Sequence, residues 1–105
     1  MAATKTVNID YFRYKHLLKT RQTANGVTEI FDPVRRKFLV LQPEELVRQL
    51  TLLYLLDRGF SIKKMRTEIG ITINGLQKRC DILVFDKNLQ PFLLVECKAA
   101  NVDID

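Results

Sequence analysis

Two carboxylates and a lysine stand in two apolar segments near the C-terminus. Asp81 belongs to the segment 79–85, and Glu96 and Lys98 belong to the segment 91–98. Paired carboxylates suit a hard divalent cation such as Mg²⁺, which prefers oxygen ligands. A lysine beside such an ion can contact a phosphate oxygen or an attacking water and stabilise the negative charge that develops. These residue types therefore predict phosphodiester hydrolysis at a metal site.

The two segments are expected to form a β-hairpin, because residues 86–91 between them are rich in turn formers. A four-residue loop sets a register in which Asp81 lies directly opposite Glu96, with Cβ atoms about 5 Å apart. Lys98 falls on the same face, about 6.6 Å further along the strand. The predicted hairpin therefore gathers all three side chains at one end of one face.

The opposite face of this hairpin is apolar and carries Cys80, Ile82, Val84, Leu93, Val95 and Cys97. Strands that are apolar on both faces are usually covered. A charge at the end of such a strand is costly to desolvate unless a partner or a metal compensates it. This context favours a functional site over a solvated strand end with salt bridges. The two cysteines are expected to be reduced core thiols.

A helix is predicted over residues 43–58, with Gly59 as its stop. At 100° per residue, Glu45 shares a stripe with buried leucines and borders the core. Glu44 is instead expected to pair at the surface with Arg48, four residues further on. Glu45 is thus a candidate third metal ligand. Compensation of the positive end of the helix dipole is its alternative role.

The remaining segments predict further strands. Residues 27–31 and 37–41 are expected to form one hairpin, and residues 62–73 form a strand. Asn74-Gly75 is a strong two-residue turn signal that leads from this strand into the one with Asp81. Together the elements indicate an α/β domain whose mixed, mainly antiparallel sheet packs on the predicted helix.

The net charge of +5 is unevenly placed. The first forty residues hold eight Lys or Arg against three Asp or Glu, and the rest of the chain is balanced. We divide the chain into a basic N-terminal arm, 1–26, and a domain core, 27–105. A basic patch binds phosphates in a salt-dependent way, and a solvated arm is the alternative. The candidate nucleic-acid contacts are Arg35, Arg36, Lys37, Lys78 and Arg79, of which the last two could instead neutralise the carboxylates.

Several segments resemble the PD-(D/E)XK nuclease superfamily. More narrowly, the sequence resembles the nuclease-like domain at the N-terminus of type I restriction enzyme R subunits and its small stand-alone relatives. The similar segments are 30–38, 41–49, 75–85 and 94–99. The resemblance implies a restriction-endonuclease-like fold and a metal-dependent endonuclease that acts in restriction or DNA processing.

The resemblance also implies roles for individual residues. Asp81 and Glu96 would be ligands of Mg²⁺ or Mn²⁺, Glu45 a third ligand, and Lys98 the catalytic lysine. Cys80 departs from the family pattern, because it stands before the motif aspartate where the superfamily name implies proline.

A second departure concerns the C-terminus. Such domains continue after the second motif strand with a helix and further strands, whereas this sequence ends at Asp105. We therefore expect a C-terminally incomplete domain. Either the sequence is a truncated piece, or a partner chain or a second copy completes the domain. A catalytically silent nucleic-acid-binding module and an oligomerisation module are the alternative functions. The sequence has no apolar run of membrane-spanning length, and we expect a cytoplasmic location, with nucleic acid, DNA foremost, as partner.

Overall fold

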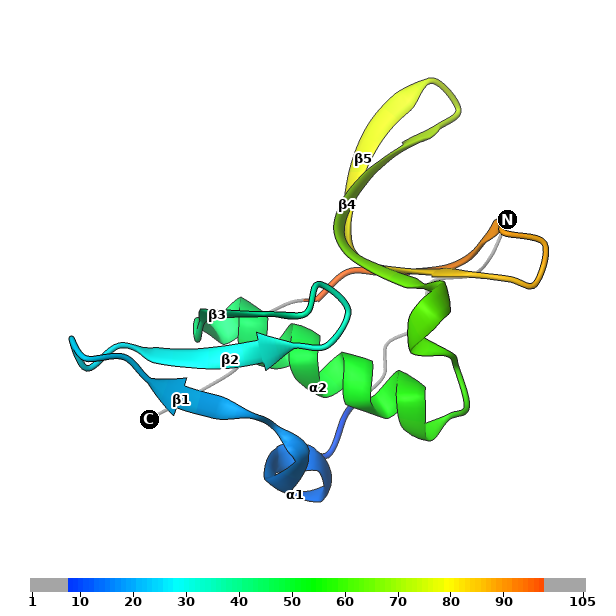
Figure 1. The fold of residues 1–105 in the computed structure, drawn as a ribbon. Coiled ribbons are helices and arrows are strands. Elements are labelled where there is room, and N and C mark those ends of the chain that lie inside the picture. Colours follow the sequence, from blue (N-terminus) through cyan, green and yellow to red (C-terminus); the bar gives the residue numbers. More distant parts are fainter. Residues whose placement is uncertain (1–7, 98–105) are drawn as a thin grey trace.

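The fold combines one long helix with two small three-stranded sheets (Figure 1). The computed structural model describes residues 8–97, without the side chains of residues 71, 73 and 78. The helices are α1 (Tyr11–Tyr14) and α2 (Pro43–Asp57), with 3₁₀ turns at Lys15–Leu17 and Ile62–Lys64. The strands are β1 (Thr20–Gln22), β2 (Thr28–Asp32), β3 (Lys37–Val40), β4 (Met65–Ile73), β5 (Leu76–Phe85) and β6 (Pro91–Val95). This content confirms the α/β class.

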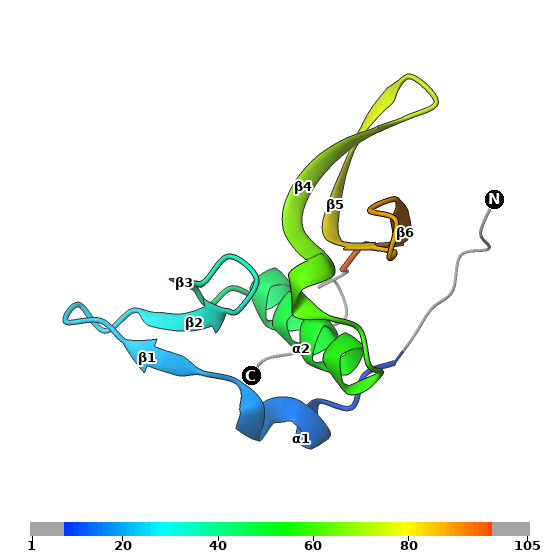
Figure 2. The same cartoon turned by 45° about the vertical axis from the view of Figure 1, so that its right-hand side comes forward.

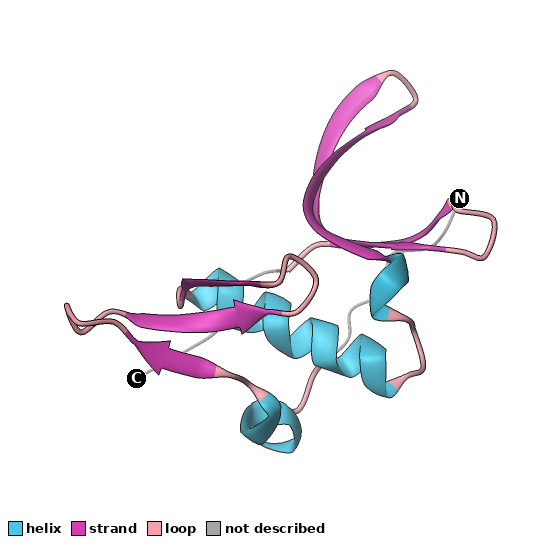
Figure 3. Cartoon of the chain, viewed as in Figure 1, coloured by secondary structure: helices cyan, strands magenta, loops and turns pink. Residues whose placement is uncertain are grey.

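The strands divide into two sheets where one mixed sheet was expected. The orders are β1-β2-β3 and β4-β5-β6, and every neighbouring pair is antiparallel. The first sheet lies along α2, whereas the long β4–β5 hairpin curves away from it (Figures 1 and 3). The strand expected from residue 62 begins at Met65 instead, because Ser61 starts a 3₁₀ turn by accepting a hydrogen bond from the backbone of Lys63.

Helix α2 begins and ends as predicted. A proline occupies its first turn, and Glu44 and Glu45 lie beside its positive end. The backbone of Gly59, just after the helix, has φ = +96°, a conformation that favours glycine. The extent of α2 therefore follows from local signals at its two ends.

The β5–β6 hairpin has the predicted register from Ile82 to Val84, and beside the turn, where Phe85 pairs with Pro91, it is shifted by one residue. Ile82 pairs with Val95, and the next pairs keep the same step until a bulge between Val84 and Phe85. In Figure 2, β6 lies beside the lower part of β5, away from the tip of the β4–β5 hairpin. The turn of that longer hairpin is formed by Asn74 and Gly75, with φ = 51° and 78°, as two-residue turns with both residues left-handed require.

The segment before residue 27 is partly built into the domain. Strand β1 pairs with β2, and α1 contacts α2. Tyr14 is buried there, and its hydroxyl donates a 2.8 Å hydrogen bond to Asp57 at the end of α2. Tyr14 thus anchors the segment, while Tyr11 and Phe12 are exposed. The division of the chain at residue 26 stays a prediction.

The main core lies between α2 and the β4–β6 sheet. Its main cluster comprises Leu52, Leu55, Met65, Ile82 and Val84, and a smaller one comprises Tyr14, Leu46 and Leu50. Cys80 is buried, Cys97 is partly buried, and both are free thiols, as expected. No helix within residues 8–97 is long and apolar enough to cross a membrane.

Candidate functional site

A buried arginine of α2 lies where carboxylates from three elements meet. Arg48 donates from Nη1 to Glu45 at 2.5 Å, and from Nη2 to Glu68 at 2.5 Å and to Asp81 at 3.0 Å. Its side chain is only 4% exposed, and its Nε finds no hydrogen-bond partner among the described residues. We call Glu45, Glu68 and Asp81 the carboxylate cluster.

The carboxylate cluster stabilises the positive charge of Arg48. Burial lowers the pKa of Arg48, but the hydrogen bond to Asp81 and the negative charges of Glu45 and Glu68 raise it above its ordinary value on balance. A buried cation of this kind is costly unless it is paired. Arg48 is therefore charged in the folded chain, and it ties α2 to strands β4 and β5.

Asp81 lies where the hairpin register predicted. Its Oδ1 accepts from Arg48, and its Oδ2 accepts a 2.6 Å hydrogen bond from the backbone N–H of Cys97. The last strand pair is Ile82 with Val95, so one further step along the ladder brings Asp81 beside Glu96, which is exposed. Glu96 follows directly after β6, so the two predicted ligands lie at the same end of the hairpin.

Glu45 also faces the core, as its helical stripe predicted. Its Oε1 accepts from Arg48 and, at 3.3 Å, from Arg35, while its Oε2 accepts from Gln49 at 2.9 Å. The predicted surface pair between Glu44 and Arg48 is wrong. Arg48 turns inward to Glu45 and to the sheet, because three carboxylates there offset the cost of its burial.

Glu68 is a member of the cluster that the sequence analysis missed. It lies in β4 between Thr67 and Ile69, which pair with the residues on either side of Asp81. Its Oε1 accepts from Arg48 and its Oε2 from Arg79. The hydrogen bond from Arg79 holds the pKa of Glu68 below its usual value, more than burial raises it. The two-residue turn at Asn74-Gly75 was the signal that could have placed Glu68 opposite Asp81.

Asp32 was missed as well, and it forms an ion pair with Arg35. The Asp32 carboxylate is fully buried and accepts from the backbone N–H groups of Val34 and Arg35, from Arg35 Nε at 2.8 Å, and from the Thr67 hydroxyl. Arg35, predicted to contact nucleic acid, thus bridges Asp32 and Glu45. This network joins the β2–β3 turn to β4 and α2.

Three of the other predicted basic contacts are exposed. Arg36 lies in the β2–β3 turn, Lys37 is the first residue of β3, and Arg79 on β5 pairs with Glu68. Lys78 pairs in the backbone ladder with Ile71, and its side chain is not among those described. Lys98, the predicted catalytic lysine, lies outside the described residues.

Residues 43–105 match the family model of the type I restriction enzyme R protein N terminus (HSDR_N). The chain belongs to this family. No curated protein and no solved structure matches it. The matched span contains the whole carboxylate cluster with Arg48, Glu96 and Lys98, whereas Asp32 and Arg35 precede it.

In this R-protein N-terminal chain, the donor atoms suit a hard cation. Within residues 8–97, no group of three or more His, Cys, Asp or Glu is placed to hold a metal ion. The cation among these carboxylates is the guanidinium of Arg48. The ion pairs of the cluster join that of Asp32 with Arg35 into one network, whose net formal charge is −1. It contains four carboxylates and three guanidinium groups: Asp32, Glu45, Glu68 and Asp81, and Arg35, Arg48 and Arg79.

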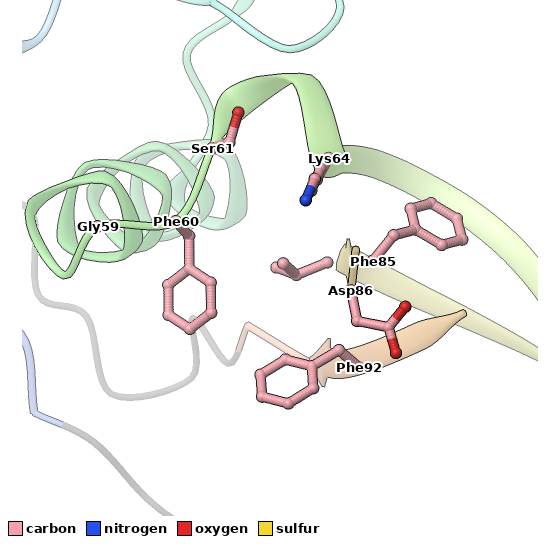
Figure 4. A pocket seen from close by; sticks show the side chains of 8 residues that line it. Gly59, Phe60, Ser61, Lys64, Phe85, Asp86 and Phe92 are labelled. Carbon is pink, nitrogen blue, oxygen red and sulfur yellow. The ribbon is translucent and has the colours of Figure 1, made fainter. Parts of the chain in front are cut away.

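A separate hollow of about 300 Å³ opens beyond the end of α2 (Figure 4). The neighbouring rings of Phe60 and Phe92, 6.2 Å apart between centroids, line it together with Lys64 and Asp86 (Figure 4). No residue of the carboxylate cluster lines it. In this family member the candidate chemistry thus lies in the ion-pair network and outside this hollow.

Proposed function

We propose that the chain is a divalent-metal-dependent endonuclease domain of the PD-(D/E)XK type, which hydrolyses DNA as part of a restriction system. The convergence of Asp81 and Glu45 on one cation position, inside the span that matches the R-protein family, carries this proposal. The hairpin register supports it, because it brings Glu96 to the same end of β5 and β6. Two free cysteines agree with a reducing, cytoplasmic location.

The residues have distinct roles in this proposal. Asp81, Glu96 and Glu45 would hold Mg²⁺ or Mn²⁺. The ion, when bound, supplies polarisation of a phosphoryl oxygen and a lowered pKa of the attacking water. The backbone N–H of Cys97 fixes the orientation of the Asp81 carboxylate through its 2.6 Å hydrogen bond.

Basic residues serve the substrate and the developing charge. Lys98 stabilises the negative charge on the phosphoryl group. Arg36 and Lys37, both exposed, contact backbone phosphates without reading the sequence. Lys78 and Arg79 extend this contact along β5.

A catalytically silent nucleic-acid-binding module is the second candidate. The observation in its favour is that Arg48 already neutralises the carboxylates: both oxygens of Glu45 and both of Asp81 accept hydrogen bonds. In such a module the basic residues bind phosphates and the ion network serves only the fold.

A cleavage assay separates the two candidates. Supercoiled plasmid and single-stranded DNA are incubated with the wild type, with Asp81→Asn and with Lys98→Met, in Mg²⁺, in Mn²⁺ and in EDTA. We expect divalent-dependent cleavage that falls by about 100-fold or more in both variants, the usual cost of losing one group that stabilises transition-state charge. Cleavage unchanged in Asp81→Asn rejects the proposal. DNA binding in EDTA that survives Asp81→Asn, with no cleavage under any condition, establishes the silent module.

A further inference from the structure

We propose that one face of the β1–β2–β3 sheet binds single-stranded nucleic acid by stacking unpaired bases on its aromatic rings. We call it the outer face, and its residues are Lys19, Arg21, Glu29, Phe31, Phe38 and Val40. All of them precede the span 43–105 that matches the R-protein family, and none belongs to the carboxylate network. The site goes beyond the proposed function, because binding there needs no cleavage.

The strand register determines which side chains share the outer face. Ile30 and Asp32 of β2 are fully buried. Because side chains alternate along a strand, Glu29 and Phe31 point to the opposite side. Phe31 pairs directly with Phe38 of β3, and directly paired residues lie on the same face of a sheet. The two rings are therefore neighbours on the outer face, with centroids 5.2 Å apart and planes inclined by 60°.

The outer face is open to solvent. Glu29 pairs with Arg21 on one side and with Val40 on the other. The side chain of Arg21 is 56% exposed, and Val40 is 51% exposed. Helix α2 contacts β2 and runs along the sheet (Figure 1), so it covers the buried side and leaves the outer face accessible to a partner.

A cation lies over each ring of the outer face. The guanidinium carbon of Arg21 is 3.9 Å from the centroid of the Phe38 ring, and Nζ of Lys19 is 5.8 Å from the centroid of the Phe31 ring. Aromatic rings and guanidinium planes are the surfaces on which unpaired bases stack. The bases of a duplex stack on one another and offer only their edges. This surface therefore favours a single strand over a duplex.

The charges around the rings suit a polyanion. Glu29 accepts from Nε of Arg21 at 2.8 Å, whereas the two Nη atoms of Arg21 form no hydrogen bond within residues 8–97. Three cations of this sheet and of the residues next to it form no ion pair in the described part of the chain: Lys19, Arg36 and Lys37. Such groups bind phosphates whatever the sequence. A polymer with a phosphate and a flat base in every unit matches both the cations and the rings.

The test is the fluorescence anisotropy of a labelled oligothymidylate of about 12 nucleotides, a length within the range of single-strand sites. It is titrated in EDTA with the wild type and four variants. Phe38→Leu removes a stacking ring and keeps an apolar side chain. Its matched control is Phe92→Leu, because Phe92 is an exposed ring beside another ring on β6. Arg21→Met is matched by Arg13→Met, because both arginines are exposed and pair with one carboxylate.

We expect Phe38→Leu and Arg21→Met each to weaken binding of the single strand by about 5-fold or more, the usual effect of losing a base-stacking contact. Both controls should change this affinity by less than about 2-fold, because they lie outside the outer face. A duplex of the same length should bind more weakly than the single strand, and Phe38→Leu should leave the affinity for the duplex unchanged.

Two results overturn the inference directly. One is wild-type affinity for the single strand in both Phe38→Leu and Arg21→Met, and the other is an equal loss of affinity for the single strand and the duplex. Polyglutamate that displaces the label as well as unlabelled oligothymidylate does would assign the face to an acidic polypeptide, which also overturns it. Titrations with oligouridylate distinguish RNA from DNA as the source of the strand, and Phe38→Leu must weaken whichever of the two binds more tightly.

The cleavage assay separates this site from the proposed function. Divalent-dependent cleavage, together with unchanged single-strand binding in Phe38→Leu, leaves the nuclease standing and rejects the outer face as a binding site. Ring-dependent binding without cleavage under any condition supports the outer face and rejects the nuclease.

A measurement on the wild type covers a ring variant that does not fold. In ¹⁵N-labelled protein, the backbone amide signals of Phe31 and Phe38 are followed as unlabelled oligothymidylate is added, with that of Phe92 as reference. Stacking predicts that the first two signals shift until they saturate, while the reference stays in place. Shifts that leave Phe31 and Phe38 unchanged overturn the inference.

Discussion

Replacement of Asp32 by asparagine should destabilise the domain more than any surface ion-pair change. The Asp32 carboxylate is fully buried and accepts four hydrogen bonds, one of them from Arg35 Nε at 2.8 Å. Asparagine keeps one acceptor oxygen for the two backbone N–H groups. It places its amide N–H₂ group, which is a donor, against the guanidinium of Arg35. It also removes the negative charge that pairs with this guanidinium.

The magnitude follows from the bonds that are lost. One charge-assisted hydrogen bond contributes about 1.5–3 kcal/mol, and we expect Asp32→Asn to lower the free energy of unfolding by about this amount. Asp32→Ala also loses the two backbone bonds, so its expected cost is about 3–5 kcal/mol. For a domain of this size, the asparagine variant should melt roughly 10–20 °C lower.

The effect should depend on pH with a defined sign. Burial raises the pKa of Asp32, but the hydrogen bonds from Arg35 and from the backbone lower it on balance below its ordinary value of 3.8. The folded carboxyl therefore has the lower pKa. Its contribution to stability is complete above about pH 4 and is lost as the pH falls through the folded value. The difference between wild type and Asp32→Asn should be constant near neutrality and shrink below about pH 4.

Urea denaturation followed by circular dichroism at pH 7 and at pH 3 measures both effects. Glu29→Gln is the control, because Glu29 also accepts from an arginine Nε at 2.8 Å, but its partner Arg21 is 56% exposed. This control should cost less than about 1 kcal/mol. Equal costs for Asp32→Asn and Glu29→Gln, or a difference that does not narrow in acid, would refute the assignment of Asp32 as a buried anchor.

Two further predictions concern stability at the C-terminal end of α2. Tyr14→Phe should lower the free energy of unfolding by about 1 kcal/mol, since it deletes the hydroxyl that donates to Asp57 at 2.8 Å; an unchanged urea midpoint would contradict this. Gly59→Ala should cost about 1 kcal/mol, because φ is +96° there and a Cβ would meet nothing within 4 Å, which leaves backbone strain as the only cause. Its melting temperature should fall, and a rise would show that the position tolerates a side chain.

Local sequence signals predicted much of the fold. Asn74-Gly75 adopts left-handed φ values at both residues, and this conformation joins β4 directly to β5. The loop before Pro91 closes the β5–β6 hairpin, but the register that leads Asp81 towards Glu96 begins only beyond the bulge between Val84 and Phe85. Both turns depend on a few consecutive residues, whose backbone preferences act without help from distant parts of the chain.

The sequence by itself thus determined the helix, three hairpins and the pairing of segments that places Asp81 near Glu96. It did not determine which carboxylates Arg48 contacts, because Glu44 and Glu45 are both within reach along the helix. In the tertiary structure Arg48 contacts Glu45, Glu68 and Asp81, because the face of α2 that carries Arg48 is buried against the sheet. A long charged side chain pairs with the carboxylates in the region from which water is excluded, because an unpaired charge is most costly there. The position of that region depends on how separate elements pack.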